Sequence, residues 1–310
     1  MQRRKFLAHL GHLTLAFSAF SPLHALDFQK PKIGYLPITD HLLIIAKELY
    51  PDSFTAVKFS SWVDLAEALR AGSIDAAFIL TPLALKLSSE NLGLKALMAA
   101  HRNGSALTTS IEISNINELK NKRIAIPSRF STHYLLLAEL LKKHSLSIDE
   151  VKLVDMSPPE MPFALQSKQI DAFIVAEPFG VIAQNFKAGK TLVTSYDIQK
   201  DHICCLFVAS KKILEQKELC QKLVNNFVKS AKLIKENPDK ALVLAKKMLG
   251  HSEAVLRQVI ETKNLISYES LVLSQDDILR TTNELKELKL GDFKNTYANF
   301  VESSFIKNAF

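Results

Sequence analysis

A segment that occurs twice constrains the fold of this chain more than any other feature. Residues 68–82 (ALRAGSIDAAFILTP) and 164–178 (ALQSKQIDAFIVAEP) are identical at six of fifteen positions. Each copy contains the end of a helix, a polar turn, an apolar run of strand length, and a proline. Because proline lacks the N–H group that a strand ladder needs, Pro82 and Pro178 mark where each strand ends.

A second pair of similar segments lies upstream of the first. HLLIIA at 41–46 and HYLLLA at 133–138 each follow a short apolar run, at 32–37 and at 123–128. The repeating unit is therefore strand, loop, helix, strand, helix, strand and proline. Repetition of a whole unit predicts an α/β fold of two similar lobes, each a mostly parallel sheet flanked by helices.

The alternation of strands and helices divides the chain into parts. After a leader at 1–25, the first lobe is predicted over 26–106 and the second over 107–202, with the polar turn at 102–105 marking the exit from the first lobe. Residues 203–310 are predicted to return to the first lobe through the strand ICCLFVAS. They then continue as helices, because their apolar residues recur at helical spacing.

The first 25 residues have the features of an export signal. MQRRK is basic, a weakly apolar stretch follows, and the tripeptide that ends at Ala25 resembles a signal-peptidase site. Arg3 and Arg4, followed by Lys-Phe-Leu, are similar to the twin-arginine export signature, and an uncleaved N-terminal helix is the alternative. No later stretch reaches the ~18 uninterrupted apolar residues of a transmembrane helix. We therefore expect a periplasmic protein, cleaved near Ala25 and exported by the twin-arginine or the general secretory route.

Charge and motifs exclude several function classes. The leader contributes part of the net charge of +7, and the remaining basic excess is mild and evenly spread, which argues against nucleic-acid binding. The sequence contains no G-x-S-x-G, P-loop, H-E-x-x-H or G-x-G-x-x-G motif. We therefore expect no catalytic residues and no cofactor.

The three cysteines do not suggest a disulfide framework. Cys204 and Cys205 are adjacent, where a bond between neighbours would strain the backbone, and Cys220 lies in a predicted helix. Because no second cluster of ligand-type residues accompanies them in the sequence, no zinc or other metal site is predicted. The thiols are expected to pack as small apolar side chains.

Residues that follow the strands supply candidate ligand contacts. In open α/β sheets, ligands lie beyond the carboxyl ends of strands, close to helix N-termini, which favour anions. Two lobes built alike would present these ends to each other across a cleft. The predicted ligand-binding residues lie in these loops and at these helix starts: Thr39, Asp40, His41, Trp62, Thr81, Asn103, Ser105, Ser128, Thr132, His133 and Glu177.

Three of these residues have two interpretations. His133 would donate to an oxyanion, or it would face solvent in the first turn of its helix. Trp62, the single tryptophan, would form a wall of the site or belong to the core. Glu177 would meet a cationic group of the ligand or hold loops in place. Because the matching position in the first lobe is the neutral Thr81, amine-bearing and heterocyclic ligands stay among the candidates.

Several motifs resemble those of one family of binding proteins: Ser61-Trp62, IDAAFILTP, HRNGSA, STH at 131–133, PPEM at 158–161 and IDAFIVAEP. They are similar to motifs of the solute-binding proteins of ABC importers for nitrate, sulfonate and bicarbonate, whose close relatives bind thiamine-pyrimidine precursors. The resemblance covers nearly the whole chain after the leader. It implies a two-lobed periplasmic-binding fold of the second type, capture of a small solute by lobe closure, and delivery to a membrane permease and its ATPase. We expect a monomer.

The nitrate-binding branch resembles this chain most around Trp62, His133 and the Glu-Pro pair at 177–178. Where that branch has N-G-Q-A, this chain has NGSA at 103–106, so an amide donor expected to hold an oxyanion is missing. The run HICC at 202–205 is weakly similar to the cysteine-rich segment of thiamine-pyrimidine synthases. An enzyme on the same fold therefore stays an alternative, and a ligand-sensing module is another.

Overall fold

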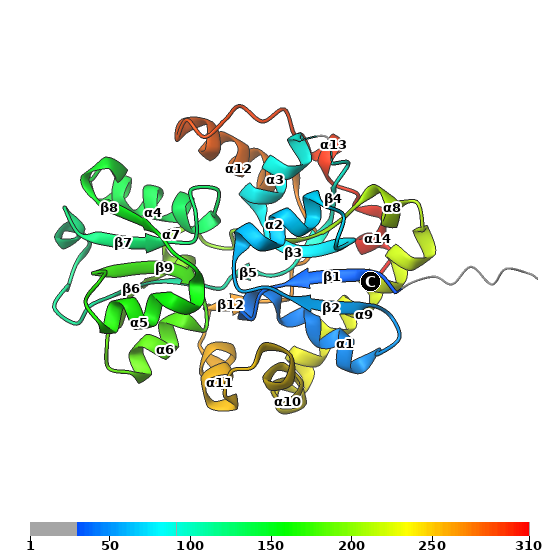
Figure 1. Cartoon of the computed structure of the whole chain (residues 1–310), viewed down its shortest axis with the longest axis horizontal. Coiled ribbons are helices and arrows are strands. Elements are labelled where there is room, and N and C mark those ends of the chain that lie inside the picture. The colour runs from blue at the N-terminus through cyan, green and yellow to red at the C-terminus, as the bar shows by residue number, and fades with distance from the viewer. Residues whose placement is uncertain (1–29, 91, 310) are drawn as a thin grey trace, which may run out of the picture.

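The structure consists of two lobes, each built on a five-stranded sheet flanked by helices (Figure 1). This computed structural model describes residues 30–90 and 92–309 of the 310-residue chain. The predicted leader at 1–25 lies outside the described residues. The described part of the chain contains no helix with the length and apolar character that crossing a membrane would require.

The first lobe holds a sheet with the strand order β2-β1-β3-β11-β4. Its strands are β1 (Lys32–Tyr35), β2 (Thr55–Lys58), β3 (Ala76–Leu80), β4 (Lys95–Ala99) and β11 (Cys205–Ala209). Between its strands lie η1 (Thr39–Ile45), α1 (Ala46–Leu49), α2 (Trp62–Arg70) and α3 (Thr81–Ser89). β3 and β11 are buried at every position, which fits their place in the middle of the sheet.

The second lobe holds a sheet with the strand order β10-β6-β9-β7-β8. Its strands are β6 (Ser105–Thr109), β7 (Arg123–Ile126), β8 (Lys152–Asp155), β9 (Ala172–Ala176) and β10 (Lys190–Thr194). Its helices are η2 (Ile116–Leu119), α4 (Thr132–Lys143), η3 (Ile148–Glu150), η4 (Pro158–Glu160), α5 (Met161–Gln166), α6 (Phe179–Asn185) and α7 (Ser195–Ile198).

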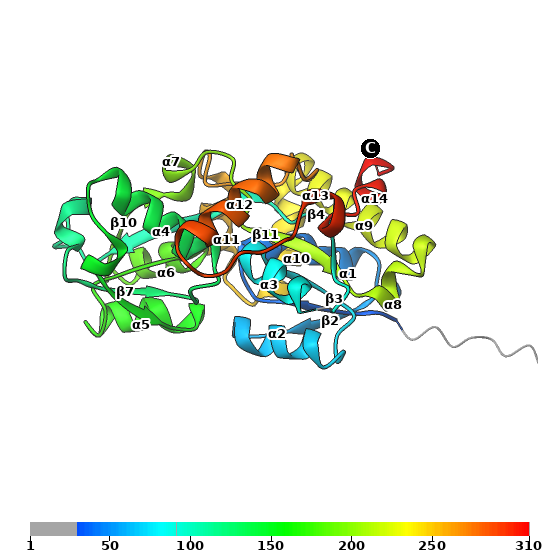
Figure 2. The same ribbon diagram turned by 90° about the horizontal axis from the view of Figure 1, so that it is seen from above.

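The C-terminal part is mostly helical and reaches both lobes. It comprises α8 (Lys211–Leu214), α9 (Lys217–Glu236), α10 (Pro238–Leu249), α11 (Glu253–Glu261), α12 (Gln275–Glu287), α13 (Tyr297–Phe300) and α14 (Ser304–Lys307). A short strand, β12 (Ile266–Ser267), pairs with β5 (Arg102–Asn103). Figure 2 shows α11 and α12 along the border of the lobes, where Glu284 of α12 accepts a hydrogen bond from Gln199 at 2.8 Å.

In each sheet four of the five strands run in the same direction and one is reversed, so the expectation of mostly parallel sheets is confirmed. In the first sheet, β1 pairs in parallel with β2 and β3, whereas β11 runs antiparallel to β3 and β4. In the second, β7 pairs in parallel with β8 and β9, whereas β6 runs antiparallel to β9 and β10. The chain enters β6 and β11 directly from the other lobe. These two strands therefore start at the edge where the others end.

Several helices begin at the residues where the sequence predicts a helix to begin, with one exception. Ser61 caps α2 by accepting from the N–H of Asp64, and Ser131 caps α4 by accepting from the N–H of Tyr134, each at 3.1 Å. The segment HLLIIA at 41–46, expected to start a helix at His41, differs: residues 39–45 form a 3-10 segment, and His41 has non-helical φ/ψ of −106° and 20° inside it. A helix dipole aimed at the cleft from His41 is therefore not part of the fold.

The core of the first lobe contains a cluster of aromatic rings beneath α9. Phe227 of α9 packs against Phe78 of β3 and Phe207 of β11, with ring centroids 4.9 and 4.8 Å apart. Phe54 adds a fourth ring, 5.8 Å from Phe227. The buried face of α9 thus fixes the C-terminal helices to the sheet, and the helical spacing of its apolar residues in the sequence is confirmed.

Candidate functional site

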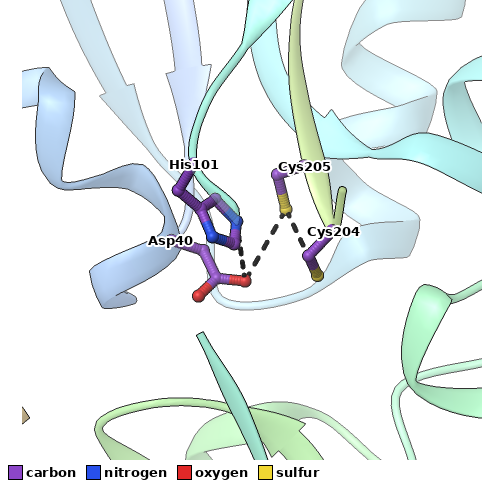
Figure 3. Close-up of side chains that lie close together, drawn as sticks. All are labelled: Asp40, His101, Cys204 and Cys205. Atoms are coloured by element: carbon purple, nitrogen blue, oxygen red, sulfur yellow. Dashed lines mark hydrogen bonds and ion pairs between the residues drawn. The ribbon is translucent and has the colours of Figure 1, made fainter. Parts of the chain in front are cut away.

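Polar side chains gather where the strands of the first sheet face the second lobe. Asp40 follows β1, His101 follows β4, and Cys204 and Cys205 lie at the start of β11. Because β11 is antiparallel to β4, its start lies at the same edge of the sheet as the end of β4. All four side chains are fully buried, and one oxygen, nitrogen or sulfur atom from each lies within 4.8 Å of the others (Figure 3). We call these four residues the edge cluster.

Within the edge cluster the carboxylate of Asp40 lies between His101 and Cys205. Its Oδ2 is 3.2 Å from Nε2 of His101 and 3.9 Å from Sγ of Cys205, and the two sulfur atoms are 4.0 Å apart. Apart from this ion-pair contact, both ring nitrogens of His101 and Oδ1 of Asp40 are without a hydrogen-bond partner. A buried polar atom without a partner costs about 1–3 kcal/mol. Several such atoms in one place are typical of a binding site.

The second lobe contacts the edge cluster through α4. The Thr132 hydroxyl donates to the Cys204 carbonyl at 3.0 Å, and the same carbonyl accepts from the hydroxyl and the N–H of Thr81. His133 Nε2 lies 3.9 Å from Sγ of Cys204 and 3.0 Å from the hydroxyl of Ser105, while its Nδ1 has no partner. Residues of both lobes thus meet at Cys204.

A backbone contact joins the lobes beside this cluster. The N–H and hydroxyl of Thr39 both donate to the carbonyl of Glu177, at 2.9 and 2.8 Å. The N–H of Glu177 donates in turn to the carbonyl of Gly104. Gly104 adopts φ of +96°, and a Cβ placed on it would lie 2.7 Å from Oδ1 of Asp40 and 3.0 Å from the ring of His101. Only glycine lets the crossover segment approach the edge cluster this closely.

The remaining predicted site residues have mainly internal contacts. His41 accepts from the N–H of Leu36 at 2.8 Å, and its ring packs edge-on against Trp62, 5.4 Å away. Trp62 is 3% exposed and its indole N–H has no hydrogen-bond partner, so both of its interpretations stay open. Asn103, in the left-handed region at φ of 61°, accepts from the N–H of Asp201. Ser128 is half-buried, and its carbonyl accepts from the hydroxyl of Ser131.

Sequence reasoning missed part of this site. The expectation that no ligand-type residues accompany the cysteines is wrong, because Asp40 and His101 lie beside Cys204 and Cys205. All three cysteines are free and buried, so their description as packing residues is correct but incomplete. The available signals were the position of His101 directly after a strand and the run HICC at the start of the return strand.

Burial changes the protonation of the acidic and basic groups. Burial raises the pKa of Asp40 to about 7 and would by itself lower that of His101, but the Asp40 carboxylate raises the His101 pKa to about 10. The pair therefore retains a proton at neutral pH. Burial also opposes ionisation of Cys204, yet the hydrogen bond from Cys205 and the nearby His133 bring its pKa below the usual range.

Glu177 provides a pH-dependent prediction. Burial raises its pKa from 4.5 to about 7, against the opposing N–H groups of Val181 and Gly180, and Asp40 adds to the rise. The folded state therefore favours the protonated carboxyl: the cost of ionising it is absent below about pH 4.5, grows up to pH 7 and is constant above. We expect Glu177→Gln to raise the free energy of unfolding by about 3 kcal/mol at pH 8 and by less than about 1 kcal/mol at pH 5. Urea unfolding at the two pH values measures this, and an equal change at both would contradict it.

Comparison with known proteins identifies the family of this chain. The model of the NMT1-like family matches residues 26–250. The chain belongs to the NMT1-like family. A solved structure from Staphylococcus aureus, the ligand-binding component of an ABC-type import system with zinc bound, is 31% identical to this NMT1-like chain. The match covers 91% of this chain and 99% of that one, with a TM-score of 0.83.

Nitrate-binding proteins are among the other relatives. The periplasmic nitrate-binding protein NrtA of Synechocystis PCC 6803 has a TM-score of 0.80 at 16% identity, covering 91% of this chain and 88% of that one. The nitrate/nitrite binding protein NrtA of Nostoc is 26% identical over 203 residues, which are 56% of this chain and 46% of that protein. The chain spans between 29% and 46% of the first curated relatives that it matches. The two-lobed periplasmic-binding fold is confirmed.

Proposed function

We propose that this NMT1-like protein is the periplasmic solute-binding component of an ABC importer. It works as a monomer without catalytic residues, encloses a small solute between its lobes, and delivers it to a permease and ATPase in the inner membrane. One observation carries the proposal. Fully buried polar atoms of the first lobe (Asp40 Oδ1 and both ring nitrogens of His101) and of the second lobe (His133 Nδ1) lie without partners around Cys204, where the lobes meet.

The charge of the site bears on the class of solute. The resemblance to nitrate-binding and sulfonate-binding proteins predicts a small anion. In the described residues, however, no lysine or arginine is among the buried polar and charged side chains, whereas Asp40 and Glu177 are both buried. An anion would have the protonated His101 as its counter-charge and two carboxyl groups close by. The set of solutes to be tested must therefore include neutral heterocycles and metal ions beside the anions.

Ligand-induced stabilisation tests the proposal. Residues 26–310 are purified and heated with nitrate, bicarbonate, taurine, an alkanesulfonate, a pyrimidine or Zn²⁺, while Trp62 fluorescence is recorded. A solute present at ~100 times its dissociation constant adds about 2.7 kcal/mol to the stability of the folded state. We expect one class to raise the midpoint at stoichiometric occupancy. If none of these solutes changes it, the proposed function is contradicted.

A further inference from the structure

We infer that the edge cluster binds one divalent metal ion of the zinc class, with Asp40, His101, Cys204 and Cys205 as its ligands. This inference rests on the proposed function in one respect: the ion is the solute that the second lobe covers on closure.

The kinds of ligand atom point to zinc. Two thiolates, one imidazole and one carboxylate are the groups that Zn²⁺ takes in proteins, in sets of four. Soft sulfur ligands select against Mg²⁺ and Ca²⁺, which prefer sites made of oxygen atoms alone. The carboxylate oxygen of Asp40 in turn favours Zn²⁺ over Cu(I), which prefers soft ligands throughout.

The distances between the ligand atoms fit a tetrahedral site. With zinc bonds of usual length, neighbouring nitrogen, oxygen and sulfur ligands lie about 3.3 to 3.8 Å apart. In the edge cluster Asp40 Oδ2 is 3.2 Å from His101 Nε2 and 3.9 Å from the sulfur of Cys205, and the two sulfur atoms are 4.0 Å apart. These three distances are within a few tenths of an ångström of the tetrahedral values, and all four ligand atoms lie within 4.8 Å of one another.

Several polar atoms of the cluster are free to take up an ion. Both ring nitrogens of His101 and Oδ1 of Asp40 have no hydrogen-bond partner although their side chains are fully buried. The backbone around the thiols, by contrast, is held firmly: the Cys204 carbonyl accepts from Thr81 and from Thr132. Groups that fix the direction of ligands strengthen metal binding. Rigid backbone beside unpartnered polar atoms favours metal binding.

All four ligands belong to the first lobe. Asp40, His101 and Cys205 belong to the edge of the first sheet, and Cys204 directly precedes β11. The second lobe reaches Cys204 through Thr132 and His133. The first lobe alone therefore holds the complete ligand set, and the second lobe adds the cover that excludes water. An ion bound in this way links occupancy of the site to closure.

Metal titration with matched cysteine variants tests the inference. Residues 26–310 are reduced, freed of metal with a chelator and titrated with Zn²⁺ against a colorimetric competitor, and with Co²⁺ as a spectroscopic probe. We expect one equivalent of metal and a thiolate-to-cobalt charge-transfer band. Cys205→Ser and His101→Gln should each weaken Zn²⁺ binding at least about 100-fold. Cys220→Ser, which changes a buried thiol of α9 outside the cluster, should bind as the unaltered protein does.

The outcomes separate this inference from the proposed function. Circular dichroism checks that each variant is folded. If a cysteine or histidine variant is not, Asp40→Asn, the smallest change to a ligand, replaces it in the comparison with the unaltered protein. The metal site is overturned if the reduced protein does not bind Zn²⁺ stoichiometrically. It is also overturned if Cys220→Ser loses as much Zn²⁺ affinity as the variants of the cluster do. If zinc fails while an anion or heterocycle raises the thermal midpoint, the metal site alone is wrong. If zinc binds at the cluster but the lobes do not move, the ion is structural, and zinc is not the solute that the lobes enclose.

Discussion

Gly104→Ala is expected to weaken binding at the edge cluster by about 100-fold. The new Cβ would lie 2.7 Å from Oδ1 of Asp40 and 3.0 Å from the ring of His101, on a backbone with φ of +96°. A side chain at positive φ costs about 1–2 kcal/mol, and overpacking of a rigid site adds about 1–3 kcal/mol. We expect about 3 kcal/mol of this cost to raise the free energy of the ligand-bound state with its lobes closed, which corresponds to roughly 100-fold in affinity. Calorimetric titration of Zn²⁺ into the reduced protein measures the change.

Gly250→Ala is the matched control for this experiment. Gly250 also has positive φ, +83°, but a Cβ on it meets no atom within 4 Å. It ends α10 in the left-handed conformation, far in sequence from the crossover at Gly104. Its substitution should lower stability by a similar backbone strain and leave affinity unchanged. An equal loss of affinity in both variants would show that general destabilisation, and not the approach of Gly104 to Asp40, sets the binding energy.

Phe227→Ala is expected to lower the free energy of unfolding by about 4 kcal/mol, within the range for removal of a buried aromatic ring. Phe227 is fully buried and lies 4.8 to 5.8 Å, between ring centroids, from Phe207, Phe78 and Phe54. Loss of the ring leaves a cavity between α9 and the first sheet. Urea unfolding followed by circular dichroism measures the difference.

Phe163→Ala serves as the control for the core substitution. Phe163 is 58% exposed and packs against Phe186, another exposed ring. Its removal should change the free energy of unfolding by less than about 1 kcal/mol. If Phe227→Ala were no more destabilising than Phe163→Ala, the aromatic cluster would not be what fixes α9 to the first lobe.

The repeated segment predicted the fold because its signals are local. β3 ends at Leu80 and β9 at Ala176, each two residues before the proline of its copy. Serine caps and apolar spacing likewise depend on neighbours along the chain, and Ser61 and Ser131 cap helices as expected. Such features can be inferred from sequence because the residues that form the pattern are the same residues that form the structure.

The reversed direction of β6 and β11 could not be inferred in this way, and neither could the edge cluster. β6 and β11 are antiparallel because the chain enters them from the other lobe, which is a property of the path and not of any local pattern. Cys205 meets Asp40 across 165 positions of sequence. Adjacent cysteines in an apolar run indicate packing when considered alone. Only the sheet order, which places the start of β11 beside the end of β4, brings them to Asp40 and His101.

Small-angle X-ray scattering of residues 26–310, reduced and freed of metal, tests the central claim of lobe closure around an occupant of the edge cluster. One equivalent of Zn²⁺ should reduce the radius of gyration, and Gly104→Ala should stay expanded at the same zinc concentration. An unchanged radius of gyration with bound Zn²⁺ and with every solute of the thermal-shift set would contradict the account.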